Sequence, residues 1–242
     1  MTPEEQQMFG AARSGRTQEL VRLLEQGVSS NIRDEEGDTP LHLAARGGHT
    51  ECARLLLDRG ADLSTRNRRS ETPIHFAAMH GHPESASLLL DRGADPNVRD
   101  GDDDTPLHYA ARGGHVECAR FLLARGADPN GRNTHGNTTL HAASVRGQSE
   151  CLHVLLDHGA DPNVQNNIGD SPLHLAAWNG RAACVRFLLD RSADLELRNS
   201  EGHTARDLAL KQGRADCVDL LDAHAAREAL GDLWAGREGV RP

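Results

Sequence analysis

The chain repeats one short motif at intervals of 33 residues, and this period is the feature that most limits the folds open to it. The motif is a hydroxyl residue, usually followed by proline, then an aliphatic residue and a histidine. Clear copies begin at Thr39, Thr72, Thr105, Thr138 and Ser171, and a degenerate copy begins at Thr204. A fixed period of this kind predicts a stack of like units, each of which contacts only its neighbours.

The same register extends toward both ends of the chain. Residues 6–15 align with residues 39–48 without a gap, so seven repeats are expected. Their boundaries are 1–33, 34–66, 67–99, 100–132, 133–165, 166–198 and 199–231, with 232–242 as a C-terminal tail. We therefore predict one repeat domain over residues 1–231 and almost no chain for a second domain.

The fourth repeat shows how one unit is built. Residues 100–104 are rich in Asp and Gly, which favour turns, so they predict the tip of a hairpin loop. Thr105 can cap a first helix that has Pro106 at its first position. A second helix follows Gly114 and ends at Gly126, with apolar residues at core spacing. Since no segment has a strand pattern long enough for a sheet, the repeat predicts a helix-turn-helix unit.

The motif Thr-Pro-Leu-His at residues 105–108, followed by Ala110 and Ala111 and repeated at this period, resembles the ankyrin repeat family. The resemblance implies an all-α ankyrin-repeat solenoid of helix-turn-helix units joined by β-hairpin loops. It also implies a noncatalytic protein-protein interaction module, an adaptor or scaffold that binds a partner protein through its concave inner-helix and fingertip surface. Two alternatives stay open: a regulatory subunit or inhibitor of one enzyme, and a secreted host-directed ankyrin effector.

The first and last repeats differ from the inner ones as capping repeats should, because an end faces water where an inner repeat has a neighbour. Repeat 1 has Glu19 where five other repeats have cysteine. Repeat 7 has Arg206 and Asp207 in place of Leu-His, and Asp222 in place of a core leucine. Residues 2–5, Thr-Pro-Glu-Glu, look like a capping box. These features predict N- and C-terminal capping repeats and favour a complete chain.

Composition narrows the class of partner. The net charge of -9 and the pI near 5.8 disfavour phosphate backbones, and no basic stripe with interleaved aromatics occurs, so nucleic acid is not expected as a partner. The N-terminus lacks a signal-peptide pattern, and no segment approaches a membrane span. We expect a protein that is monomeric alone and cytoplasmic, and also nuclear if the source is a eukaryote.

Cysteine and histidine recur at fixed repeat positions instead of clustering as metal ligands. The cysteines are Cys52, Cys118, Cys151, Cys184 and Cys217. The main histidine column is His42, His75, His108, His141 and His174. Neighbours in a column should lie a helix-packing distance of about 8 to 10 Å apart, which disfavours disulfides and shared metal ions. We predict no metal, cofactor or catalytic site; the resemblance implies that each histidine bonds to the preceding hydroxyl and to loop backbone.

Four aspartates within residues 100–104 form the densest charge in the chain. A calcium loop is excluded, because Thr105 stands where that loop requires glycine and Ala111 stands where it requires glutamate. A solvated acidic fingertip is the first interpretation, and an electrostatic contact to a basic partner is the alternative.

The partner-binding surface is predicted from the fingertips and from the thirteenth repeat position. Trp178 occupies that position in repeat 6, and an exposed indole is a typical interface anchor. An apolar strip is predicted from Met79, Val145, Ile168 and Trp178. Its arginine flanks suit a peptide with acidic flanks; alternatively, the strip only covers neighbouring helices. The full predicted set is Arg46, Arg68, Arg69, Met79, His80, Asp102, Asp104, Arg112, His135, Val145, Arg146, Ile168, Trp178 and Asn179.

Other apolar residues are assigned to packing. Phe76 and Tyr109 follow the Leu-His pair or its equivalent and are expected in the packed inner face. Leu230, Leu233 and Trp234 share one helical face, so we expect the last helix to continue and cover the end of repeat 7. A short docking motif in the tail stays open as the alternative.

Overall fold

The computed structural model describes the backbone of residues 1–238 and the side chains of residues 1–229. Within that part of the chain it contains fourteen α-helices and no strand. This confirms the all-α class predicted from the repeat pattern. The helices belong to two compact units, unit 1 (Met1–Thr134) and unit 2 (His135–Pro242).

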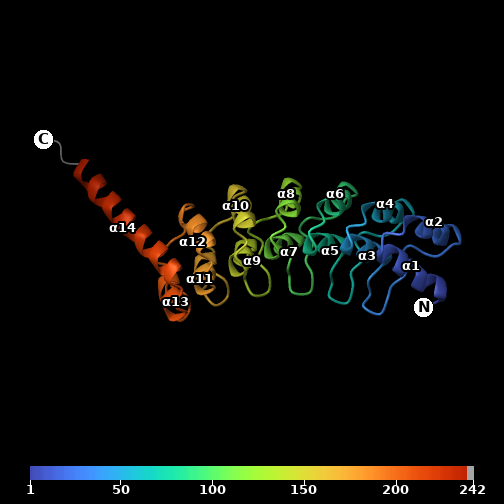
Figure 1. The fold of residues 1–242 in the computed structure, drawn as a ribbon, viewed down its shortest axis with the longest axis horizontal. Helices are drawn as coiled ribbons and strands as arrows, with labels where there is room; N and C mark the ends of the chain where they lie inside the picture. The colour runs from blue at the N-terminus through green and yellow to red at the C-terminus, as the bar shows by residue number, and fades with distance from the viewer. Residues whose placement is uncertain (239–242) are drawn as a thin grey trace. The chain divides into compact units, whose positions relative to one another are not determined.

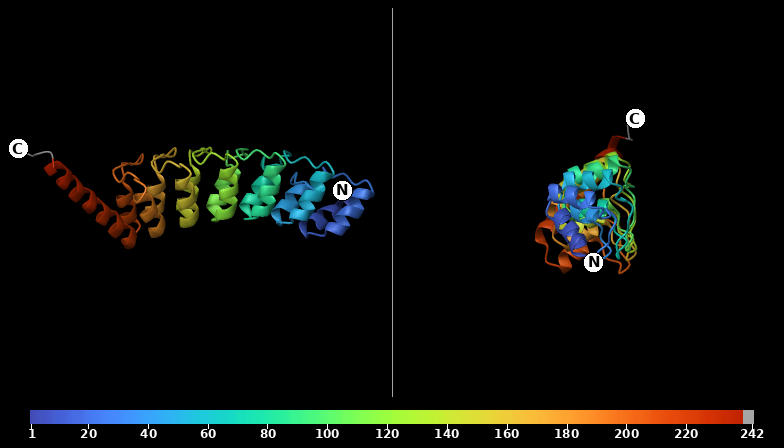
Figure 2. Two further views of the ribbon diagram at one scale, coloured as in Figure 1. Left: turned by 90° about the horizontal axis from the view of Figure 1, so that it is seen from above. Right: turned by 90° about the vertical axis from the view of Figure 1, so that its right-hand side faces the viewer.

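Unit 1 consists of four helix pairs. They are α1 (Pro3–Arg13) with α2 (Thr17–Glu25), α3 (Pro40–Arg46) with α4 (Thr50–Asp58), α5 (Pro73–Met79) with α6 (Pro83–Asp91), and α7 (Pro106–Gly113) with α8 (Val116–Ala124). The first helix of each pair packs against the first helix of the next pair, and the second helices pack in the same way. Figure 1 and Figure 2 show these pairs side by side in chain order, with the connecting loops on the side of the first helices.

Unit 2 repeats the same arrangement in three pairs. They are α9 (Thr139–Arg146) with α10 (Ser149–Asp157), α11 (Pro172–Trp178) with α12 (Ala182–Leu189), and α13 (Ala205–Lys211) with α14 (Ala215–Glu238). The last helix continues past residue 231, as expected. The side chains of Leu230, Leu233 and Trp234, which were expected to cover the end of repeat 7, lie outside the described side chains.

The first helices begin at the repeat motif because the histidine column caps them. The backbone N–H and the hydroxyl of Thr39 both hydrogen-bond to Nδ1 of His42, at 3.1 and 2.9 Å. Nε2 of the same ring lies 3.2 Å from the carbonyl oxygen of Glu71 in the next loop. A carbonyl oxygen only accepts, so Nε2 carries the hydrogen and Nδ1 is the acceptor. The same bonds are made by His75, His141 and His174.

Burial sets the protonation state of these histidines. Removal from water disfavours the charged imidazolium and lowers the pKa of His42 to about 4. The same cause lowers the pKa of His75 and of His174. The rings are therefore neutral at pH 7, which is the state that their hydrogen bonds require. The structural role implied by the family resemblance is confirmed for these residues.

A second column of residues closes the C-terminal ends of the first helices. Nε2 of His82 donates to the carbonyl oxygen of Arg46, the last residue of α3, at 2.9 Å. That carbonyl has no partner within its own helix. The ring packs on Gly48, where φ is +68° and a Cβ atom would come within 2.4 Å of the imidazole. Equivalent bonds are made by His49, His115, Arg181 and Arg214.

The loops between pairs have hairpin form. The backbone N–H of Asn67 donates to the carbonyl of Glu71, and its side-chain Oδ1 accepts from the N–H groups of Arg69 and Glu71. One backbone bond of 2.9 Å, from the N–H of Arg68 to the carbonyl of Glu36, joins this loop to the preceding one. A single bond of this kind does not make a strand, which explains why the expected hairpins contain no strand in the described range.

Both ends carry the capping features that the sequence predicts. The hydroxyl of Thr2 accepts from the N–H of Glu5 at 3.2 Å, and the Glu5 carboxylate accepts from the N–H of Thr2 at 2.7 Å. This confirms the capping box of α1. In repeat 7, Arg206 and Asp222 stand at positions that are apolar in inner repeats, and they pair with each other at the surface at 2.9 Å.

Candidate functional site

Four predicted partner-binding residues line one groove of unit 1. They are Arg46, Arg69, Met79 and His80. Arg46 and Met79 are the last residues of α3 and α5, which pack against each other, so their common repeat position places both at the same edge of the unit. Phe76 contributes an apolar wall, and the groove encloses about 300 Å³. The structure therefore brings fingertip and helix-end residues together, as the prediction assumed.

Two of the three carboxylates in this groove are already engaged. Asp38 is 6% exposed and Glu71 is 4% exposed, and Nδ2 of Asn67 donates to both, at 2.8 and 2.9 Å. Burial raises the pKa of Asp38. By contrast, Arg46 and Arg69 are exposed and make no side-chain hydrogen bond or ion pair within the described residues. The exposed rim of the groove thus offers mainly hydrogen-bond donors.

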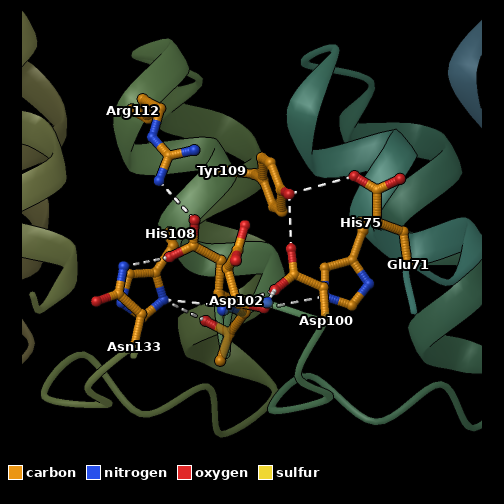
Figure 3. Close-up of polar contacts among 10 residues, drawn as sticks. Glu71, His75, Asp100, Asp102, His108, Tyr109, Arg112 and Asn133 are labelled. Carbon is orange, nitrogen blue, oxygen red and sulfur yellow. Dashed lines mark hydrogen bonds and ion pairs between the residues drawn. The ribbon is translucent and has the colours of Figure 1, made fainter. Parts of the chain in front are cut away.

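A buried polar network extends from this groove to α7 (Figure 3). The hydroxyl of Tyr109 lies 2.6 Å from Oδ2 of Asp100 and 3.2 Å from Oε1 of Glu71. Burial, reinforced by the two carboxylates, raises the pKa of Tyr109, so the phenol keeps its hydrogen. This hydroxyl has one hydrogen to donate to two carboxylates. The network joins the third and fourth repeats within unit 1.

The acidic fingertip is only partly solvated, which corrects the first interpretation of residues 100–104. Asp102 is exposed, but Asp100 and Asp104 are buried. Asp104, only 5% exposed, accepts from Nη2 of Arg112 at 2.6 Å and from Nδ2 of Asn133 at 2.8 Å. A partner would have to displace these bonds to reach Asp104 or the end of Arg112. Their predicted role in partner binding stays a prediction, with Asp102 the more accessible member.

Unit 2 has a groove of a different character. Its apolar lining consists of Ile168, Leu175, Trp178 and Leu208, and it encloses about 440 Å³. Ile168 is 62% exposed and Trp178 is 37% exposed. The rim charges are Glu201 and Lys211, whose charged atoms lie 4.0 Å apart. Apolar contact, and not net charge, therefore dominates this surface.

The other predicted residues lie outside both grooves. Arg68 and His135 are exposed in loops, Arg146 is exposed at the end of α9, and Val145 is half-buried beside it. Asn179 follows α11 and its side-chain amide donates to a helix carbonyl at 2.8 Å. Their role in partner binding stays a prediction.

The predicted apolar strip is divided between the units. Met79 belongs to unit 1, whereas Val145, Ile168 and Trp178 belong to unit 2. Within unit 2, Ile168 and Trp178 share a groove that Val145 does not line. Ile168 and Trp178 are thus a local apolar pair, and the four-residue strip stays a prediction.

The cysteine column consists of five buried, free thiols. Burial raises the pKa of Cys184 to about 11 and also raises the pKa of Cys52 and of Cys217. The thiols of Cys52, Cys184 and Cys217 are therefore protonated and poorly nucleophilic at neutral pH. Among the described residues, no group of three or more His, Cys, Asp or Glu side chains is placed to hold a metal ion.

Sequence reasoning missed the network around Tyr109, which it assigned to apolar packing. A signal was present in the repeat register. Asp100 stands at the repeat position where the neighbouring repeats have Asn67 and Asn133, each of which donates to a carboxylate of the preceding loop. An ionised aspartate has no hydrogen to donate in this way. The only tyrosine of the chain lies nine residues later, and its hydroxyl donates to Asp100. The hydroxyl of Tyr109 thus supplies a donor at the place where Asp100 cannot.

Comparison with known families agrees with this architecture. A model of ankyrin repeats (3 copies) matches residues 8–100 and 94–166, and a model of ankyrin repeats (many copies) matches residues 155–209. The crystal structure of the human ASB11 ankyrin repeat domain is similar to this chain, with a TM-score of 0.82 and 30% sequence identity. The match covers 93% of this chain and 98% of that one.

The chain therefore belongs to the ankyrin repeat family. Proteins with curated descriptions gave no match. Ankyrin repeats are generally protein-protein interaction modules and are typically noncatalytic. Of the helices in the described part of the chain, none has both the length and the apolar character needed to cross a membrane.

Proposed function

We propose that this protein is a noncatalytic adaptor or scaffold, and that it binds a partner protein through the groove of unit 2 formed by the end of α11 and the adjacent loops. The observation that carries the proposal is the exposure of Trp178 and Ile168 in one groove with Leu175 and Leu208. An isolated exposed apolar residue is ordinary, but a concave apolar site with a tryptophan at its edge is typical of a binding hot spot.

The rigidity of the groove supports the proposal. Trp178 is the last residue of α11, and its carbonyl is held by Nε of Arg214 at 3.2 Å. The loop that carries Ile168 is held by an Asx turn, in which Oδ1 of Asn166 accepts from the N–H groups of Ile168 and Asp170. A surface that is ordered before binding loses little conformational entropy when a partner binds, which favours affinity.

The experiment is affinity capture from lysate of the source cells with three forms of the full chain. The forms are the wild type, the double variant Trp178→Ala/Ile168→Ala, and Leu210→Ala as a control. Leu210 is 51% exposed on α13 in the same unit but does not line the groove. A partner held by the wild type and the control, but not by the double variant, supports the proposal. Equal capture by all three forms contradicts the site.

The captured proteins also separate the alternative roles. Capture of two proteins that bridge through this chain supports an adaptor, whereas capture of one enzyme whose activity then falls supports an inhibitor or regulatory subunit. We further propose a reducing compartment such as the cytoplasm, because five buried thiols at one repeat position are typical of proteins that never meet oxidising conditions. Fractionation of the source cells tests this location.

A further inference from the structure

We infer that the groove of unit 1 is a second docking surface, and that its occupant is a protein segment with a carboxylate side chain beside an apolar one. The inference concerns a different groove from the one in the proposed function. It is carried by the charges and hydrogen-bonding groups that line the groove.

The cationic groups of the groove are exposed and have no side-chain partner in the described part of the chain. Arg46 and Arg69 line it, are both exposed, and make no side-chain hydrogen bond or ion pair within the described part of the chain. Each guanidinium has several N–H donors in a planar fork that matches a carboxylate. Burial, reinforced by the charge of Arg46, lowers the pKa of His80 in the same lining, so its ring is neutral at pH 7.

The anionic groups of the groove are, by contrast, mostly occupied. Asp38 and Glu71 are buried and both accept from Nδ2 of Asn67, and Glu71 also lies within hydrogen-bond distance of the Tyr109 hydroxyl. Glu36 is the one exposed carboxylate among the described lining residues. An incoming cation meets only one exposed carboxylate, that of Glu36, whereas an incoming carboxylate meets two exposed guanidinium groups that have no side-chain partner. Two exposed guanidinium groups against one exposed carboxylate leave the accessible part of the lining positively charged, which favours an acidic segment.

The floor and the size of the groove add the apolar requirement. Phe76 is buried in the wall, and Met79 is half-buried at the end of α5. A volume of about 300 Å³ is at the small end for ligand sites, which suits a side chain or two of a partner segment better than a large cofactor. Methionine adapts to side chains of varied shape, so the groove should accept several apolar residues of the partner segment. The carboxylate of the segment is the more specific feature.

The net charge of the chain, -9, does not prevent an acidic segment from binding once it is in contact with the groove. Charges separated by more than about 8 Å are largely screened at physiological salt. The two guanidinium groups act at hydrogen-bond distance, where the rest of the surface contributes little.

The test is a selection of short random peptides displayed on phage against the full chain, followed by affinity measurements on the selected peptides by fluorescence anisotropy. The groove variant is Arg46→Gln/Arg69→Gln. The matched control is Arg54→Gln/Arg120→Gln, which removes the same charge from exposed positions on α4 and α8 of the same unit. Circular dichroism and melting confirm that each variant is folded.

We expect the selected peptides to carry Asp or Glu beside an apolar residue, and to bind the groove variant at least about tenfold more weakly while binding the control within about twofold. Replacing the peptide's acidic residue by its amide should cause a similar loss. Failure to select peptides, selection of peptides without acidic residues, or equal loss in both variants would overturn the inference. Peptides that lose affinity only with Trp178→Ala occupy the unit 2 groove; they too overturn it, while leaving the proposed function intact.

Discussion

One phenolic hydrogen serves two buried carboxylates at the contact between the third and fourth repeats. The hydroxyl of Tyr109 lies 2.6 Å from Asp100 and 3.2 Å from Glu71, and it can donate to only one of them at a time. Glu71 receives the amide of Asn67 from its own loop, but it lacks the asparagine donor from the next loop that Asp38 and Asp104 receive. A residue that differs from its equivalents in the other repeats thus marks a position where hydrogen bonding is incomplete.

Replacing Asp100 by asparagine should restore the missing donor. The new side-chain carbonyl can keep the bonds to the N–H groups of Asp102 and Asp104, and the amide can donate to Glu71. We expect Asp100→Asn to raise the free energy of unfolding by about 1 kcal/mol, measured by urea denaturation. Asp102→Asn, which removes the same charge from an exposed position in the same loop, should change it by less than about 0.5 kcal/mol. Equal effects would contradict the role of the network.

Acid should destabilise the protein through its buried histidines. The pKa of His42 falls from about 6.5 in the unfolded chain to about 4 in the fold, so the unfolded state binds more protons between these values. Stability is therefore full above about pH 6.5 and is lost as the pH falls toward 4, by about 3 kcal/mol for His42 alone. Calorimetry between pH 7 and pH 5 should show the melting temperature falling.

The contribution of His42 can be isolated with His42→Gln. Glutamine can still accept from the N–H of Thr39, as in a capping box, but it does not titrate. The variant should be less stable than the wild type at pH 7 and should lose less stability on going to pH 5. The same loss in both proteins would show that other groups cause the acid sensitivity.

Ser144 is a second residue whose replacement should stabilise the fold. It is fully buried in α9 at a position where the other inner repeats have alanine, and its hydroxyl makes no hydrogen bond within the described structure. Ser144→Ala removes a buried polar group without a partner and improves helix propensity, so we expect a gain of about 1 to 2 kcal/mol in chemical denaturation. A loss of stability would mean that the hydroxyl has a partner after all.

At the scale of elements, the sequence predicts helices and loops well because each repeat encodes them locally. Hydroxyl caps, prolines at the first helical turn and glycines at the ends recur in register, and the structure forms helices where they predict them. The surface is harder to predict, because burial of a loop carboxylate depends on the neighbouring repeat. Asp102 and Asp104 are two residues apart, yet only Asp104 faces an arginine and an asparagine from other elements.

The contact between the second histidine column and the glycines is an element-level prediction. In Gly48→Ala, the new methyl group meets the His82 ring and the backbone must hold φ at +68°. Gly27→Ala has a similar φ of +87°, but nothing lies within 4 Å of the added atom. We expect a loss of about 1 kcal/mol for Gly27→Ala and at least about 2 kcal/mol for Gly48→Ala in thermal unfolding. Similar losses would show that the ring contact contributes little.

At the scale of the whole molecule, the sequence gives no reason to expect self-association. The chain has a net charge of -9, and its exposed large apolar residues among the described side chains are few and scattered except at the unit 2 groove. We expect light scattering coupled to size exclusion to give the monomer mass of 26.2 kDa. A dimer that dissociates in the Trp178→Ala variant would assign the groove to a second copy of the chain.

We propose that the groove of unit 2 binds another protein. The most direct measurement is photo-crosslinking in the source cells, with a benzophenone amino acid in place of Trp178 and, in a parallel strain, in place of Leu210. We expect a covalent adduct with a distinct protein from position 178 and none, or far less, from position 210. An adduct from 210 alone, or no adduct from 178, would contradict it.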